Sequence, residues 1–255
     1  MGKYFDTGWL KPITPVTNQI GTSSGDAAFG DKDIVWDWLA IDIPKGTHRL
    51  INASMIVQGT HGARQAEVDF QLWFARPVDG VAPPSLGTPN AVVSGTGHRK
   101  HMVGIVDFDA THAGGDCSPF NSFYSTGTVS RSGAATTTPG LIVAGDPTSG
   151  TNVGYDKLYV AAVSKGTHNW GASTVVSDGT QSTSSPTITV KTVSAVITCG
   201  PGDILRDEDG LLFGTVKTVD SATSITLEDN SASNTTDEKL VYNTTPITIV
   251  ASFER

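Results

Sequence analysis

Three histidines and two aspartates in the stretch GHRKHMVGIVDFDATH come nearest to forming a chemical site. Imidazole and carboxylate groups bind Zn²⁺ and similar divalent cations, and His98 and His101 are spaced so that they can converge in one turn. The other candidate ligands are His112, Asp107 and Asp109. Their spacing is generic, and the chain has neither an HExxH motif nor paired CxxC motifs. A polar loop that faces another subunit is therefore the favoured interpretation, and a metal-dependent hydrolase is the alternative.

Other reactive side chains occur without the partners that catalysis needs. Cys117 follows His112 by five residues, but a nucleophile and its base converge in space, so sequence proximity is weak support for a thiolate pair. Cys199 is typical of a small apolar residue at a strand end. The acidic segment 206–210, RDEDG, lacks the ligand spacing of an EF-hand and favours a hairpin turn. With no GxSxG, Walker A or dinucleotide-binding motif, the sequence predicts a protein that is not an enzyme and holds no cofactor or metal.

Charge and composition exclude several classes of partner. The formal net charge is −8 and the longest basic run is the pair Arg99 and Lys100, so we expect no binding to DNA or RNA. The apolar stretch 34–43 is interrupted by Asp37 and Asp42, so no membrane span is expected. Two cysteines, and an amino terminus without the apolar core of a signal peptide, predict reduced thiols and assembly in a cytoplasm.

The periodicity of apolar residues predicts an all-β fold. The segments AEVDFQLWFAR and LINASMIVQG alternate between apolar and polar positions along most of their length. Their predicted inner faces consist of Val68, Phe70, Leu72 and Phe74 in the first segment and Ile51, Ala53, Met55 and Val57 in the second. Trp73 interrupts the polar face, which indicates a contact outside the sandwich or under a loop. The run IVWDWLAIDI is apolar on both faces and predicts a central strand or an interface strand.

On this pattern the chain divides into four parts. Residues 1–30 have scattered aromatics without a period and are predicted to form an extended N-terminal arm. Residues 31–175 combine dense strand signals with long polar loops and are predicted to form a jelly-roll-like β-sandwich. A turn-rich linker, 176–186, precedes a small β-barrel or β-sandwich domain, 187–255. From residue 176 onward the chain has 5 basic and 11 acidic residues, so the second domain is the acidic one, and 247–253 is expected to close it as a paired strand.

The segment GDILRDEDGLLFGTVKTVDSATSITLEDNSA resembles a small β module in virion proteins of tailed bacteriophages. The features that carry the resemblance are an acidic segment, a Gly-Thr-Val-x-x-Val strand, a short turn and a strand of the Thr-Ile-Thr-Leu type. The preceding strands and Ser/Thr/Gly loops are similar in texture to the jelly-roll or sandwich domains of phage decoration and fibre proteins. The resemblance implies a structural virion protein on the capsid surface, assembled in the host cytoplasm as a homo-oligomer, expected to be a trimer, without catalytic residues.

The resemblance leaves two functions open. The leading expectation is a capsid decoration, or cement, protein that binds the major capsid protein and stabilises the assembled capsid. The alternative is a tail or head-fibre protein that recognises a carbohydrate or the host, with Trp73 or Trp170 as a platform on which a sugar stacks.

Aromatic residues outside the clearest alternation are the candidates for contact with other subunits, because aromatic side chains dominate interface energetics. Each of them can instead belong to the core of its own domain. The candidates are Tyr4, Phe5, Trp9, Trp73, Phe120, Phe123, Tyr124 and Trp170.

Overall fold

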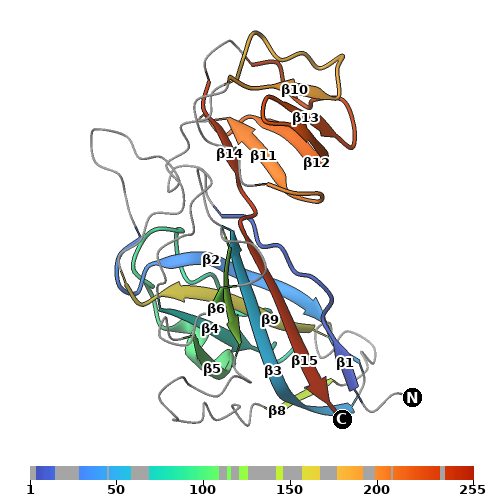
Figure 1. Cartoon of the computed structure of the whole chain (residues 1–255). Coiled ribbons are helices and arrows are strands. Elements are labelled where there is room, and N and C mark those ends of the chain that lie inside the picture. The colour runs from blue at the N-terminus through green and yellow to red at the C-terminus, as the bar shows by residue number, and fades with distance from the viewer. Residues whose placement is uncertain are drawn as a thin grey trace.

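A computed structural model of the chain confirms the all-β prediction, with three antiparallel sheets (Figure 1). Two sheets pack face to face as a sandwich, and the third forms a second unit at one end of it. The structure describes residues 4–14, 29–44, 46–58, 69–108, 114–115, 121–125, 142–145, 157–166, 177–191, 199–207, 209–235 and 239–255.

The first sheet of the sandwich has six strands in the order β1-β15-β3-β7-β6, and β8 also pairs with β3. The strands are β1 (Tyr4–Asp6), β3 (Gly46–Gln58), β6 (Gly114–Gly115), β7 (Asn121–Ser125), β8 (Ile142–Gly145) and β15 (Ile247–Glu254). At 13 residues, β3 is long enough to pair with β15 along one side and with both β7 and β8 along the other. It is the strand around which this sheet is built.

The second sheet has four strands in the order β2-β9-β4-β5. They are β2 (Ile34–Asp42), β4 (Phe70–Ala75), β5 (Met102–Phe108) and β9 (Lys157–Ser164), and the 3-10 helix η2 (Gly97–His101) leads into β5. The run that is apolar on both faces forms β2, at the edge of the sheet and not at its centre. A later segment covers its start, since the Ile34 N–H donates to the Ala91 oxygen at 3.0 Å and the Asn90 N–H donates to the Ile34 oxygen at 2.8 Å. One face of β2 packs on the core and the covering segment packs on the other, which explains why an edge strand is apolar on both faces.

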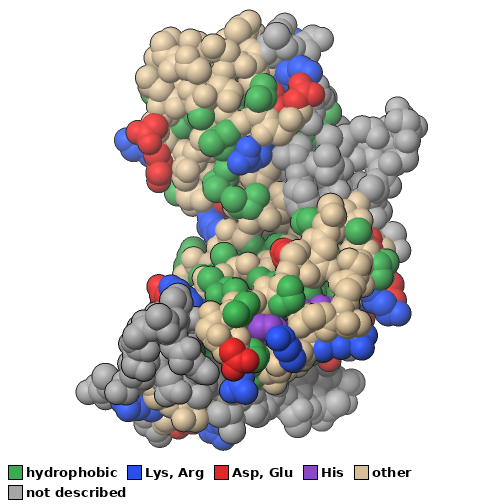
Figure 2. All heavy atoms as spheres, turned by 180° about the vertical axis from the view of Figure 1, so that it is seen from behind, with side chains coloured by type: hydrophobic (Ala, Val, Ile, Leu, Met, Phe, Trp, Pro, Cys, Tyr) green, Lys and Arg blue, Asp and Glu red, His purple; other side chains and the backbone are tan. Residues whose placement is uncertain are grey.

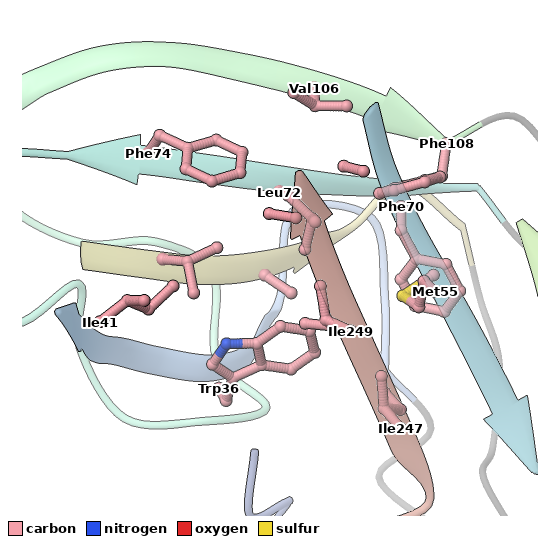
Figure 3. Close-up of a cluster of buried hydrophobic side chains, with 14 of the residues drawn as sticks. Trp36, Ile41, Met55, Phe70, Leu72, Phe74, Val106, Phe108, Ile247 and Ile249 are labelled. Atoms are coloured by element: carbon pink, nitrogen blue, oxygen red, sulfur yellow. The ribbon is translucent and has the colours of Figure 1, made fainter. Parts of the chain in front are cut away.

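The main core lies between the two sheets and draws on both of them. The inner face of β4 is the alternating set Phe70, Leu72 and Phe74, as the sequence predicts, whereas Val68 lies outside the described residues. The view of this core shows side chains of both sheets pointing toward one another (Figure 3). Those that meet the β4 side chains include Trp36, Ile41, Met55, Val106, Phe108, Ile247 and Ile249.

A bulge in β3 changes one predicted core position. The sequence places Ile51 on the inner face, but the structure buries Leu50 there and leaves Ile51 half-buried. The pairing of β3 with β15 steps from Asn52 opposite Ser252 to Leu50 opposite Phe253, so Ile51 is an extra residue. One inserted residue reverses the alternation beyond it, which a count of period two along one strand does not reveal.

The second unit has its own sheet, in the order β10-β13-β12-β11-β14. Its strands are β10 (Thr187–Thr189), β11 (Ile204–Asp207), β12 (Leu212–Ser221), β13 (Ser224–Leu227) and β14 (Val241–Asn243). β12 and β13 form the predicted hairpin, and Gly214 (φ 151°) lets β12 pass close to Leu227, because an added Cβ would lie 3.2 Å from Leu227 Cδ1. Each of the five strands contributes to a separate small core. The described strands form a sheet with two open ends, so the closed barrel predicted for this unit is not present among them.

The last strand does not close the second unit, contrary to the prediction for 187–255. β15 crosses to the sandwich and pairs with β3 from Ile247 opposite Val57 to Glu254 opposite Arg49. Figure 1 shows β15 as a long strand that leaves the second unit and runs down beside β3. The predicted set of inward residues, Ile247, Ile249, Ala251 and Phe253, is correct. The same alternation would also fit an unpaired edge of any other sheet that covers an apolar core.

The arm and the linker are likewise parts of folded units. β1 pairs with β15, and the Leu10 N–H donates to the Ile249 oxygen at 2.9 Å, so residues 4–14 are extended but lie along the sandwich edge. Residues 15–28 lie outside the described residues. The predicted linker pairs inside the second unit, through Ser177 with Val190 and Gln181 with Thr235. The buried Gln181 amide donates to the backbone oxygens of 178, 179 and 189, and such side-chain bonds replace the regular strand pattern that the sequence lacks here.

Replacement of Ile249 by alanine should destabilise the sandwich by about 2–5 kcal/mol, because it removes a buried side chain from the main core. All 5 tryptophans precede residue 171, so tryptophan fluorescence in urea follows the unfolding of this part of the chain. Val250→Ala, at a half-buried position on the other face of β15, is the control and should cost much less. An unshifted fluorescence transition in Ile249→Ala would contradict the assignment of β15 to the sandwich.

Candidate interaction surfaces

The N-terminal segment presents a row of exposed apolar side chains along the edge of the sandwich. Tyr4 is 60% exposed, Trp9 78% and Ile13 53%, and we call these three residues the N-terminal strip. The segment is held along β15 by the pairing of β1 and by backbone hydrogen bonds at Thr7 and Leu10, and Thr14 bonds to Thr244 just before β15. At about 3.3 Å per residue, the strip extends over roughly 30 Å.

A kink at Gly8 places Trp9 in solvent. In a regular strand Phe5 and Trp9 would point to the same side. Gly8 instead has φ 64°, and its N–H donates to Asp6 Oδ1 at 2.8 Å, which closes a small turn between the two aromatics. Beyond this turn Leu10 points inward to the core and Trp9 points outward. The exposure of Trp9 is therefore set by backbone geometry that the sequence pattern does not show.

Phe5 packs within its own chain. Its ring stacks on Phe253 at a centroid distance of 4.9 Å and meets the His48 ring edge-on at 4.8 Å. These contacts add Phe5 to the main core. Of the three aromatics predicted in the arm, Phe5 thus follows the core alternative, while Tyr4 and Trp9 are exposed.

Trp73 lies on the outer face of β4, under a loop, as its place on the polar face predicts. It belongs to a satellite cluster in which Trp38, Leu86 and Val93 cover the outer side of the sheet. The Trp73 indole N–H donates to Gln71 Oε1 at 3.1 Å, and its ring lies 5.8 Å from that of His98. From behind, hydrophobic side chains gather over the sandwich beside histidine side chains (Figure 2).

The histidines of the candidate metal site are used by the fold. His98 and His101 lie on η2 and are buried, and His101 Nδ1 donates to the Arg76 oxygen at 3.0 Å. Burial, followed by the nearby Arg99 charge, lowers the pKa of His98. Asp107 lies on β5 and bonds to Gln71 at 2.8 Å and to Lys165 at 3.3 Å.

His112, Asp109 and Cys117 lie outside the described residues. Within the described part of the chain, no three His, Cys, Asp or Glu side chains are close enough together to hold a metal ion.

The acidic segment after β11 is a hairpin turn, as predicted. Asp207 is buried, and its Oδ1 accepts the N–H groups of Asp209 at 3.0 Å and Leu211 at 2.8 Å. Lys239 pairs with Asp209 at 2.9 Å. Asp207 thus bonds to the backbone of its own turn, and Asp209 pairs with a lysine that lies just before β14.

A second carboxylate organises the β12–β13 hairpin. Asp220 accepts hydrogen bonds from Thr226 at 2.7 Å, Thr218 at 2.8 Å and Ser224 at 3.5 Å. The Thr226 bond, followed by the Thr218 bond, holds the pKa of Asp220 below its usual range. This end of the hairpin is exposed from Lys217 to Ser221 and carries hydroxyl and carboxylate groups, which suits a solvated surface.

The remaining candidates are only partly described. Phe123 and Tyr124 lie on β7, where their backbones pair with Ile56 and Met55, and Phe120 and Trp170 lie outside the described residues. Several exposed apolar residues were not predicted from the sequence. Ile105 could have been, because its position in the alternation with the inner residues Val106 and Phe108 places it on the outer face of β5. The others are Ile13, Val81, Val92, Leu211 and Val219.

Comparisons with protein-family models, with curated proteins and with solved structures find no match to this chain. In the part of the chain that the structure describes, no helix is long and apolar enough to cross a membrane.

Thr226→Val should raise the pKa of Asp220 toward its usual range, because it removes the strongest hydrogen bond to that carboxylate. An NMR titration of the carboxyl carbon measures the shift, and Thr223→Val, which bonds to Ser221 instead, is the control. Because folding lowers this pKa, the wild-type carboxylate should stabilise the fold above about pH 4 and stop doing so as the pH falls through the lowered pKa. Equal pKa values in wild type and Thr226→Val would contradict the role of Asp220 in the hairpin.

Proposed function

We propose that this chain is a structural protein of a tailed-phage virion, a decoration protein that binds the assembled capsid and stabilises it. The observation that carries the proposal is the N-terminal strip, a line of exposed apolar side chains on a rigid sheet edge. Single exposed apolar residues are common, but a row that includes a tyrosine and a tryptophan on ordered backbone fits an interface. The module resemblance of 202–232 indicates the same class of protein.

Energetic reasoning supports a contact role for the strip. Truncation of a buried aromatic anchor at an interface typically costs about 2 kcal/mol or more. A decoration protein binds many equivalent positions of a symmetric particle, and an oligomer engages several at once, so modest contacts sum to stable attachment. Tyr4 and Trp9 pay little ordering cost on binding, because their backbone is already fixed along β15.

The position and the surface of the second unit also support the proposal. Figure 1 places it at the end of the sandwich remote from β1 and the C-terminus. Its hairpin tip exposes threonine, serine and aspartate side chains. We therefore propose that the edge of the sandwich contacts the major capsid protein and that the second unit projects into solvent as an acidic knob, in a homo-oligomer that is expected to be a trimer.

The fibre alternative has less support. A sugar-stacking platform needs a free aromatic face and unsatisfied polar groups beside it. The Trp73 ring is packed in a satellite cluster beside His98, and its N–H is bonded to Gln71. The strip is a better fit to a protein surface than Trp73 is to a glycan.

Trp9→Ser should weaken binding to capsids at least about tenfold, since the loss of one interface anchor of about 1.4 kcal/mol or more corresponds to that factor. The assay is co-sedimentation with heads assembled from the major capsid protein encoded in the same phage genome, followed by heating of the decorated heads. Val219→Ser, at an exposed position on the knob, is the matched control and should bind as the wild type does. Fluorescence transitions in urea identify any variant that loses stability.

Equal capsid binding by Trp9→Ser, Tyr4→Ser and wild type would remove the strip from the interface. Absence of the chain from purified virions, together with no binding to heads, would overturn the proposed function.

A further inference from the structure

A lysine, an aspartate and an asparagine meet where the sandwich joins the second unit. Lys11 lies on the N-terminal segment, Asp203 in the turn before β11 and Asn243 at the end of β14. Lys11 Nζ lies 2.5 Å from Asp203 Oδ1, and Asn243 Nδ2 donates to Asp203 Oδ2 at 3.0 Å. One carboxylate therefore holds the Lys11 amine on one oxygen and the Asn243 carboxamide on the other, so that both groups are anchored at the same point, as a reaction between them requires.

The Asn243 carboxamide is fixed and polarised. Its Oδ1 accepts hydrogen bonds from the Thr245 N–H at 2.9 Å and from Thr245 Oγ1 at 3.2 Å. Its Nδ2 also donates to Gln58 Oε1 at 2.9 Å. Two donors on the amide oxygen make Cγ more electrophilic, and they are placed to stabilise the negative charge that develops on this oxygen when a nucleophile adds.

The carboxylate at the centre of the site is shielded from water, while the Lys11 side chain is 20% exposed. The Asp203 side chain is fully buried, and the turn around it supplies two further contacts, from Lys11 Nζ to the Pro201 oxygen at 3.2 Å and from the Gly200 N–H to Asp203 Oδ2 at 2.9 Å. Burial, followed by the Asp203 carboxylate, raises the pKa of the neighbouring Cys199 thiol to about 12. The buried Asp203 oxygen that contacts Lys11 Nζ is placed to exchange a proton with it.

We propose that Lys11 and Asn243 form an isopeptide bond within the chain, with Asp203 as the proton carrier. Asp203 takes a proton from the Lys11 ammonium, and the neutral Nζ attacks Cγ of Asn243 while Thr245 stabilises the charge on Oδ1. Asp203 then gives its proton to Nδ2, the Cγ–Nδ2 bond breaks, and ammonia leaves. The second proton lost by Nζ leaves with the ammonia as ammonium.

The step exchanges one amide bond for another, Cγ–Nδ2 for Cγ–Nζ. It is neither an oxidation nor a reduction and needs no further reactant. The product ties the N-terminal segment covalently to the end of β14 in the second unit. This proposal is independent of capsid binding, because it concerns bonds inside one chain.

Intact mass spectrometry of the purified full-length chain tests the bond. The wild type should be lighter than its sequence mass by one ammonia, after allowance for the initiating methionine. A protease digest should contain a branched peptide in which the Lys11 peptide is joined to the Asn243 peptide. On a denaturing gel the joined chain should migrate faster than an open one.

Three variants assign the roles. Lys11→Arg keeps a cation beside Asp203 but removes the nucleophile, so it should show the full sequence mass and no branched peptide. Asp203→Asn removes the proton carrier and should abolish the loss of ammonia or slow it to incomplete conversion. Lys157→Arg, at the lysine that pairs with Asp42, is the control and should keep the loss.

A wild-type chain that is folded by tryptophan fluorescence and has its full sequence mass would overturn the proposal. Loss of one water with Lys11 joined to Asp203 would overturn it as well, because the electrophile would then be the aspartate. The wild-type measurement is decisive even if a variant fails to fold.

Discussion

The pairing of β15 between β1 and β3 is the interaction on which the rest of the structure depends. It supplies the inward residues Ile247, Ile249, Ala251 and Phe253 to the main core, and it provides the edge along which the N-terminal segment lies. Without β15, Tyr4 to Leu10 would lose their backbone partners and Phe5 would lose the ring on which it stacks. The same pairing makes the second unit an insertion in the sandwich, since the chain leaves the sandwich after β9 and returns to it in β15.

The N-terminal segment serves two roles because one residue separates them. Gly8 adopts a left-handed conformation, so Phe5 joins the core while Trp9 faces solvent. A side chain at this position would have to take up a backbone conformation that is costly for other residues. The orientation of the side chains in the N-terminal strip thus depends on Gly8, although this residue has no side chain that could contact a partner.

Local features of this fold follow from the sequence, and long-range ones do not. The inner face of β4 and the β12–β13 hairpin depend on alternation and turn residues over a few positions, and both are correctly predicted. The partner of β15 is not predictable in this way, because an alternating apolar strand is compatible with either core. The bulge at Ile51 and the kink at Gly8 reverse the alternation without any change in composition.

The candidate sites show the same difference between local features, which the sequence predicts, and long-range ones, which it does not. Trp73 disrupts a polar face, and this local irregularity correctly indicates a loop above it. Lys11, Asp203 and Asn243 are ordinary polar residues in their own surroundings, and only the crossing of three distant segments brings them together. The histidines of η2 were singled out by residue type, yet both are buried in the fold and His101 bonds to a backbone oxygen.

The short connection between β14 and β15 determines how the molecule carries a load. Only 244–246 separate the two strands, so a force on the second unit is transmitted into the sandwich along the axis of β15. The hydrogen bonds that hold β15 to its antiparallel neighbours are perpendicular to that axis. A pull along the strand therefore loads these bonds together in shear, whereas a pull across it would open them one after another. The knob is attached in the direction in which the sheet resists force best.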